Sequence, residues 1–296
     1  MHDADWFDGS HLIAYLSSVT RGSPDFDSVP HEAMLASVDG DDPVPFDLPW
    51  GYGTALGSGH GAVAVARPRD NQWPDQRWDY RVWTRDGRSE RRDGFPVRWS
   101  WDGTKLAVLH PFGRVRSPGG WLEVVSWPEL QPIFADEPPY ATGDAQFDPT
   151  SRLVAYPTSR GDGDELEVFM RVVSLETGEV LDLARDLYSS TFWTADSNFS
   201  IVAADLSATT YDRVGGVVST WNAPALSLGA SIDGSTVAFL ETGSEARVYV
   251  MRDGETTDTV APSGEDGKVL VSPDGRALVA LIFDQGSESA FLMPGL

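Results

Sequence analysis

The sequence contains no cysteine among its 296 residues. Disulfide bridges, thiolate catalysis and cysteine-based metal sites are therefore excluded. It also lacks a run of 18 apolar residues, so no membrane-spanning helix is expected. The first ten residues are polar and acidic, without the basic and apolar regions of a signal peptide. We therefore expect a cytoplasmic protein, with a secreted or periplasmic protein whose signal peptide has been removed as the alternative.

Basic residues are few. The chain has 22 Lys and Arg against 45 Asp and Glu, which gives a formal net charge of −23. Such acidity disfavours nucleic acid and anionic membrane surfaces as partners. Lys105 and Lys268 are the only lysines, and we attribute this preference for arginine to the composition of a bacterial genome.

Signatures of metal binding and of nucleophilic catalysis are missing as well. The five histidines show no H-x-H or H-E-x-x-H spacing. The acidic clusters at 39–42 and 162–167 do not match the calcium loop of EF-hands. No G-x-S-x-G elbow occurs. We expect no metal and no cofactor, and no catalytic residue can be assigned by motif.

What the chain does contain is a repeat. A turn of the type Ser-x-Asp-Gly, followed by an apolar strand that often ends in Ala and an aromatic residue, recurs about seven times. Asp bonds the backbone N–H groups of its own turn and Gly supplies a positive φ, so each copy predicts a hairpin between two strands. The anchors, 37 to 51 residues apart, are Asp8, Gly59, Asp102, Asp148, Asp196, Asp233 and Asp274.

This spacing matches one four-stranded blade of a β-propeller. We predict an all-β fold, a seven-bladed β-propeller of four-stranded antiparallel blades in a single domain, 1–296; six blades are the alternative. Third strands are expected at 34–38, 80–83, 122–127, 167–173, 216–221, 247–251 and 290–293. The chain ends near the third strand of its last blade, so that blade has three strands or borrows one.

The pattern S-x-D-G-x-x-[LIV]-A resembles the WD40-like (PD40) repeats of TolB and of the propeller domain of prolyl oligopeptidases. Ser272-Pro273-Asp274-Gly275 is the closest copy, and the resemblance covers nearly the whole chain. It implies a propeller and leaves the function open. The Gly-His and Trp-Asp signature of true WD40 repeats is missing.

The two ends of the blades differ in the predicted topology. The Asp-Gly turns are short and alike, whereas the loops at the opposite ends, 17–30, 67–79, 110–120, 157–165 and 206–214, are long and varied. Variable loops on a rigid scaffold commonly carry function. Arg and Trp, which anchor interfaces, gather there. The predicted ligand-binding residues are Arg67, Arg69, Trp73, Trp78, Arg114 and Arg116. The alternative is that these Trp fill the core and the Arg pair with nearby Asp.

Weaker candidates for catalysis also lie at these loops. His110 ends a predicted strand and is the first residue to test as a base; Tyr211 and Asp162 are polar loop residues. A separate glycine-rich segment, 57–61, could form an oxyanion pocket or be an ordinary turn.

Two functions therefore stay open. The first is a non-catalytic module that binds a protein segment or a small molecule at the variable loops and the channel mouth. The alternative is a small-substrate enzyme (a hydrolase, lyase or isomerase, such as one of specialised metabolism) with its site over the central channel. A deep site with two titratable groups near one point would favour the enzyme.

Overall fold

The computed structural model describes residues 3–8, 10–16, 32–37, 39, 41–46, 55–68, 78–111, 120–136, 145–160, 167–184, 189–231, 233–252, 255–261, 264–284 and 287–294. Within these ranges every regular element is a β-strand. No helix there is long and apolar enough to cross a membrane.

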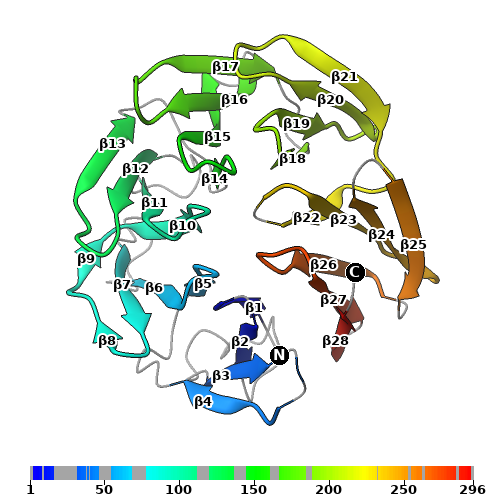
Figure 1. The fold of residues 1–296 in the computed structure, drawn as a ribbon, viewed down its shortest axis with the longest axis horizontal. Coiled ribbons are helices and arrows are strands. Elements are labelled where there is room, and N and C mark those ends of the chain that lie inside the picture. Colours follow the sequence, from blue (N-terminus) through cyan, green and yellow to red (C-terminus); the bar gives the residue numbers. More distant parts are fainter. Residues whose placement is uncertain are drawn as a thin grey trace. The chain divides into compact units, whose positions relative to one another are not determined.

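The strands form seven antiparallel sheets in chain order, the blades of a seven-bladed β-propeller (Figure 1). Six blades was therefore the wrong alternative. Blade 1 contains β1 (Asp3–Trp6), β2 (His11–Leu16), β3 (Glu32–Ser37) and β4 (Val44–Phe46). Blade 2 contains β5 (Ala55–Gly57), β6 (Ala62–Pro68) and β7 (Trp78–Thr84), with β8 (Gly87–Arg88) and β9 (Arg92–Asp93) both pairing with β7.

The next three blades have four strands each. Blade 3 contains β10 (Phe95–Trp99), β11 (Lys105–Pro111), β12 (Gly120–Ser126) and β13 (Pro132–Asp136). Blade 4 contains β14 (Gln146–Phe147), β15 (Leu153–Arg160), β16 (Glu167–Ser174) and β17 (Val180–Ala184). Blade 5 contains β18 (Ser190–Trp193), β19 (Phe199–Val202), β20 (Ser207–Tyr211) and β21 (Val217–Asn222).

The last two blades differ from each other in strand number. Blade 6 contains β22 (Ser227–Ala230), β23 (Thr236–Glu241), β24 (Ala246–Arg252) and β25 (Glu255–Ala261). Blade 7 contains β26 (Asp266–Val271), β27 (Ala277–Asp284) and β28 (Ser287–Pro294). In the described part of the chain blade 7 has three strands, as the sequence predicts.

The chain divides into two compact units. One consists of residues 1–47 and 188–296 and contains blades 1, 5, 6 and 7; the other consists of residues 48–187 and contains blades 2, 3 and 4. The prediction that residues 1–296 form a single domain therefore stays untested.

The predicted turns between first and second strands are confirmed in detail. In blade 3 the Ser100 hydroxyl donates to Asp102 at 2.8 Å and accepts the Lys105 N–H at 2.8 Å. Asp102 also accepts the Thr104 N–H at 3.0 Å, and Gly103 has a φ of 65°. Burial alone would raise the pKa of Asp102, but the hydrogen bonds from Thr104 and Ser100 outweigh it, and the pKa is lowered. The turns after Ser231 and Ser272 repeat this pattern.

The other turns show that the constant feature is the residue that closes the turn. Asp148 accepts the Leu153 N–H at 2.7 Å, as Ser100 accepts that of Lys105, so Asp148 stands at the serine position of the repeat. Thr194 accepts the Asn198 N–H at 3.2 Å in the same role. The alignment of Asp148 with Asp102 was therefore wrong by two residues. A hydroxyl and a carboxylate can both accept this closing N–H group.

The degraded copy at 57–61 is a shortened turn of the same kind. Ser58 is buried and its hydroxyl accepts the N–H groups of His60 and Ala62, both at 3.0 Å. His60 takes the place of the aspartate, and its Nε2 atom lies 2.6 Å from the Trp101 carbonyl oxygen of the next blade. These contacts account for Ser58 and His60 structurally, which favours the interpretation as an ordinary turn.

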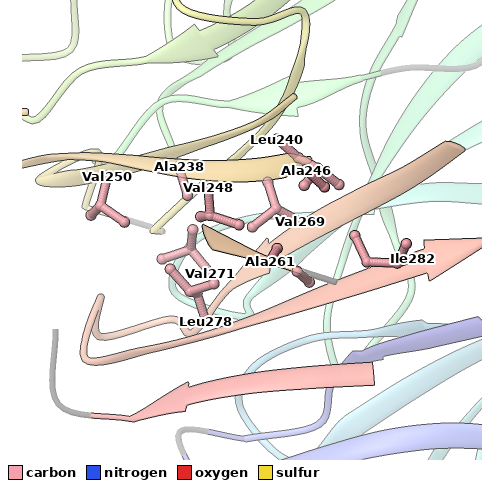
Figure 2. Packing of buried hydrophobic residues seen from close by; sticks show 11 residues of the cluster. Ala238, Leu240, Ala246, Val248, Val250, Ala261, Val269, Val271, Leu278 and Ile282 are labelled. Carbon is pink, nitrogen blue, oxygen red and sulfur yellow. The ribbon is translucent and has the colours of Figure 1, made fainter. Parts of the chain in front are cut away.

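Within each compact unit, apolar side chains join neighbouring blades. Between blades 6 and 7 the buried cluster includes Leu240 and Val248 on one side and Val269 and Leu278 on the other (Figure 2). Blade 7 also packs on blade 1 within the same unit, where the buried Trp6 meets Ala277, Val279 and Leu281 of β27. Among the described residues this junction consists of side-chain packing, with no strand shared between the two sheets.

The third strand of blade 5 differs from the prediction. The predicted third strand, 216–221, corresponds to the fourth strand, β21, and the true third strand is β20, which lies within the predicted loop 206–214. Only residues 203–206 separate β19 from β20. The segment Ser207–Tyr211 is rich in threonine and favours a strand, but the neighbouring aspartates suggested a loop.

Candidate functional site

Each blade has two ends that its hydrogen-bonding topology defines. We call the end with the turn between first and second strands the turn side, and the end where the second strand leads to the third the loop side. On the turn side, the polar groups of the repeated motif are satisfied within their own turns. The loop side of blades 2 and 3 carries a different set of residues: Trp78, Tyr80, Phe95, His110, Trp121 and Glu123, which we call the blade 2–3 cluster.

Two contacts hold the ring of His110. Its Nε2 atom lies 3.0 Å from a Glu123 carboxylate oxygen. Its ring stacks on the indole of Trp121, with centroids 3.9 Å apart and planes at 6°. A β-carbon at Gly94 would lie 3.1 Å from His110 Cε1 and, closer still, near Val108 Cγ1, so the glycine leaves space for the imidazole and for the valine. The side chains of His110 and Glu123 are 18% and 16% exposed, which leaves this fixed pair accessible to solvent.

Strand register explains this arrangement. His110 is paired with Trp121 across β11 and β12, and Glu123 lies two residues further along β12. Alternate residues of a strand point to the same face, so Trp121 and Glu123 share a face on which His110 contacts both. The prediction that His110 ends a strand on the loop side is confirmed.

Tyr80 of β7 lies near Glu123, and Asp79 precedes it in the same strand. Tyr80 is buried, and this burial raises the pKa of its phenol, with a further increase from the Glu123 carboxylate and an opposing effect of Arg92. Asp79 is fully buried and forms an ion pair with the half-exposed Arg91. A buried charge needs such a partner, so this pair fixes the segment that begins β9.

Trp78 packs against the next blade. Its ring meets that of Phe95 edge to face at a centroid distance of 4.9 Å. Both rings are partly buried against the apolar core that joins blades 2 and 3. Trp78 was predicted to lie in a loop, but it is the first residue of β7 and is paired with Pro68 of β6. Its prediction as a ligand-binding residue stays untested.

The structure describes no side chain for the other predicted ligand-binding residues. Arg67 lies within β6, where the backbone alone is described. Outside the described residues lie Arg69, Trp73, Arg114 and Arg116, and also Asp162. Their roles stay predictions.

Tyr211 does not lie in a variable loop. It is the last residue of β20 and is paired with Phe199, the first residue of β19. This places it on the turn side of blade 5, because β19 starts directly after the turn at 194–198. The loop-side position of Tyr211 was therefore wrong, for the same reason that the third strand was misplaced.

A second polar network lies where blade 3 meets blade 4. The Tyr156 hydroxyl donates to Asp136 at 2.5 Å, and Arg171 bonds Asp136 at 3.2 Å. Arg171 also binds Asp182 through two hydrogen bonds, at 2.9 and 3.1 Å. Burial, followed by the hydrogen bond to Asp136, raises the pKa of Tyr156. The polar groups of this network bond one another, and through them Asp136 of blade 3 is joined to blade 4.

The chemistry available at the blade 2–3 cluster is that of recognition and of proton transfer. Partly exposed aromatic rings offer stacking and apolar contact, and the Glu123–His110 pair offers a charge or an oriented imidazole. Among the described residues, no three His, Asp or Glu side chains gather closely enough to hold a metal ion.

No protein-family model matches the sequence, and no curated protein matches it significantly. Solved structures do match. TolB from Acinetobacter baumannii is 15% identical with a TM-score of 0.53, over 95% of this chain and 76% of that one. The β-propeller domain of the Trilobed protease from Pyrococcus furiosus is 13% identical with a TM-score of 0.59, over 80% of this chain and 78% of that one. An acylaminoacyl peptidase from Pyrococcus horikoshii is 12% identical with a TM-score of 0.59, over 80% of this chain and 44% of that one.

These matches confirm the predicted resemblance. The fold is a TolB-type β-propeller that resembles the propeller domains of peptidases. At these identities the similarity concerns the fold alone.

Proposed function

We propose that the protein is a binding module that captures a protein segment or a small molecule on the loop side of blades 2 and 3. The observation that carries this proposal is the His110–Trp121 stack held by Glu123, which presents a fixed and partly exposed aromatic surface. Aromatic residues that are already rigid bind with little further loss of conformational entropy.

Two further features support this choice. The motif that recurs on the turn side consumes its own polar groups in closing the turns, which leaves few of them for a ligand. In addition, the similarity to the Pyrococcus horikoshii peptidase covers 44% of that chain, so the shared fold is a part of that enzyme. The activity of the whole enzyme therefore does not carry over to this chain by similarity of fold.

A random-peptide phage library tests the proposal. We expect peptides to be enriched on the wild-type protein. Replacement of Trp121 by alanine should lower the affinity for these peptides by about tenfold or more, because aromatic anchors dominate interface energies. Affinities are measured with synthetic peptides of the enriched sequences. The exposed Val217 of β21, replaced by serine, serves as the control and should leave affinity unchanged. Equal enrichment on the wild type and on the Trp121→Ala variant would contradict the proposal.

An enzyme is the second candidate, which the His110–Glu123 pair favours. Glu123 can accept the proton on Nε2 and so orient the ring, which leaves Nδ1 as the acceptor of a general base. With 4-nitrophenyl acetate as the probe, an enzyme of this kind should lose about 100-fold in rate in His110→Asn. His60→Asn, on the turn side, is the matched control. Equal rates in the two variants would count against catalysis by His110.

A further inference from the structure

The third strand of blade 7, β28, differs from the third strands of the other blades. The other blades have a fourth strand beside the third, whereas β28 is the edge of its sheet in the described part of the chain. Edge strands present unpaired N–H and C=O groups, to which a further strand can add. In an antiparallel ladder every second residue of β28 directs these groups away from β27.

The strand β28 carries two large apolar side chains that are partly exposed. Phe291 is 36% exposed and Leu292 is 39% exposed, and they follow each other in the sequence Ala-Phe-Leu-Met. The other large apolar residues that are exposed to this extent lie on fourth strands or, for Val214, in a turn. In blade 6 the third strand β24 alternates buried and half-buried residues beneath β25. Among the described third strands, β28 alone thus exposes large apolar side chains to this extent.

The two exposed residues face different neighbours. Phe291 is paired with Ala280, which belongs to the buried cluster between blades 6 and 7. Leu292 is paired with Val279, which belongs to the cluster around Trp6 between blades 7 and 1. A strand added to β28 would therefore border both clusters.

Other blades show what such a strand contributes. A fourth-strand side chain packs into the cluster with the following blade in three cases: Phe134 of β13, Trp221 of β21 and Ala261 of β25. Figure 2 shows Ala261 in this position beside Val248 and Val269. The cluster around Trp6 has no such contribution among the described residues, and its margin consists of the half-buried Leu12, Leu270 and Phe283.

We propose that blade 7 binds an extended, basic segment of a partner polypeptide as its fourth strand, antiparallel to β28. An apolar side chain of that segment packs beside Leu292 on the Trp6 cluster. We infer the strand geometry and the apolar residue of this segment from the fourth strands of the other blades. We infer its basic character from the net charge of −23 of this chain, which attracts a basic partner and disfavours a second copy as the occupant. This site is separate from the blade 2–3 cluster.

The probe is a fluorescein-labelled synthetic peptide with the sequence of β21, Val-Val-Ser-Thr-Trp-Asn, flanked by two lysines on each side. Fluorescence anisotropy measures its affinity for the full chain. We expect saturable binding that Leu292→Glu weakens by about tenfold or more, since it places a charge on the apolar contact. The matched control is Val260→Glu, which puts the same charge on β25 of the complete blade 6. It should leave the affinity unchanged.

Hydrogen exchange locates the peptide. Backbone amides of β28 should gain protection, and a peptide with serine in place of tryptophan should bind more weakly. Three results would overturn the proposal: no saturation below about 1 mM, the weak limit of specific recognition; equal weakening by Val260→Glu; or protection on another edge strand. Dimerisation that Leu292→Glu abolishes would instead identify a second copy as the occupant and also overturn it. Because Trp121→Ala should not affect this peptide, failure here is distinguishable from failure of the proposed function.

Discussion

Replacement of Gly234 by alanine is expected to lower the free energy of unfolding by about 3–5 kcal/mol. Gly234 has a φ of 61°, in the left-handed region that only glycine adopts without strain. A β-carbon there would also lie 2.5 Å from the Trp193 carbonyl oxygen and 2.5 Å from the Thr194 carbonyl carbon. These are backbone atoms of the preceding blade, so the contact cannot be relieved by a side-chain rotation.

Gly178 provides the matched control for this substitution. Its φ of 72° is similar, but a β-carbon there would meet nothing within 4 Å. Gly178→Ala should therefore cost only the backbone strain, about 1 kcal/mol. Urea denaturation followed by tryptophan fluorescence measures both variants. Equal shifts of the two midpoints would show that the approach of blade 5 to Gly234 does not constrain it.

Replacement of Asp148 by alanine is expected to cost about 3–4 kcal/mol. Asp148 is fully buried, and its carboxylate accepts the N–H groups of Arg152 and Leu153 at 2.8 and 2.7 Å. It also accepts the Thr150 hydroxyl at 2.6 Å. Alanine leaves these donors without their acceptor in a site that excludes most water, at the point where the strand β15 begins with Leu153.

Serine at the equivalent positions of other turns indicates a variant that should restore part of the stability lost in Asp148→Ala. Serine closes the equivalent turns at positions 100, 231 and 272, each through one hydroxyl that accepts the N–H of the fifth residue along. Asp148→Ser should therefore recover about 1–2 kcal/mol of the loss seen in Asp148→Ala. The midpoints of thermal unfolding compare the two. A serine variant as unstable as the alanine variant would mean that Asp148 acts through its charge and not through the closing hydrogen bond.

The sequence predicted the blades because their signal is local. Ser100, Asp102 and Gly103 lie within four residues. The side chains of Ser100 and Asp102 bond within their own turn and Gly103 supplies the positive φ, so the pattern survives in the sequence. Its alignment failed where the chemistry was retained by another residue. Asp148 and Thr194 do the work of a serine, and alignment on Asp-Gly placed Asp148 at the wrong position.

The site was predicted only in part, because its contacts are not local. His110 ends a strand and could be identified as such, but its partners Trp121 and Glu123 lie across residues 112–119 and depend on strand register. Register follows from pairing and burial, and no motif in this segment fixes it. Gly94, which gives His110 its space, belongs to the link between blades 2 and 3. A glycine after the acidic Asp93 indicates a turn, and nothing in the sequence connects it to His110.

The glycines of the turns carry a consequence for the history of the chain. Gly103 lies against His60, Gly234 against Thr194, and Gly275 against Thr236, so each of these turns contacts the turn of the blade before it. Because each contact joins a turn to an equivalent turn, a duplicated blade carries both of the surfaces that it needs to pack on its original. The three contacts therefore indicate growth by tandem copying, after which individual turns diverged, as the one at 57–61 has done.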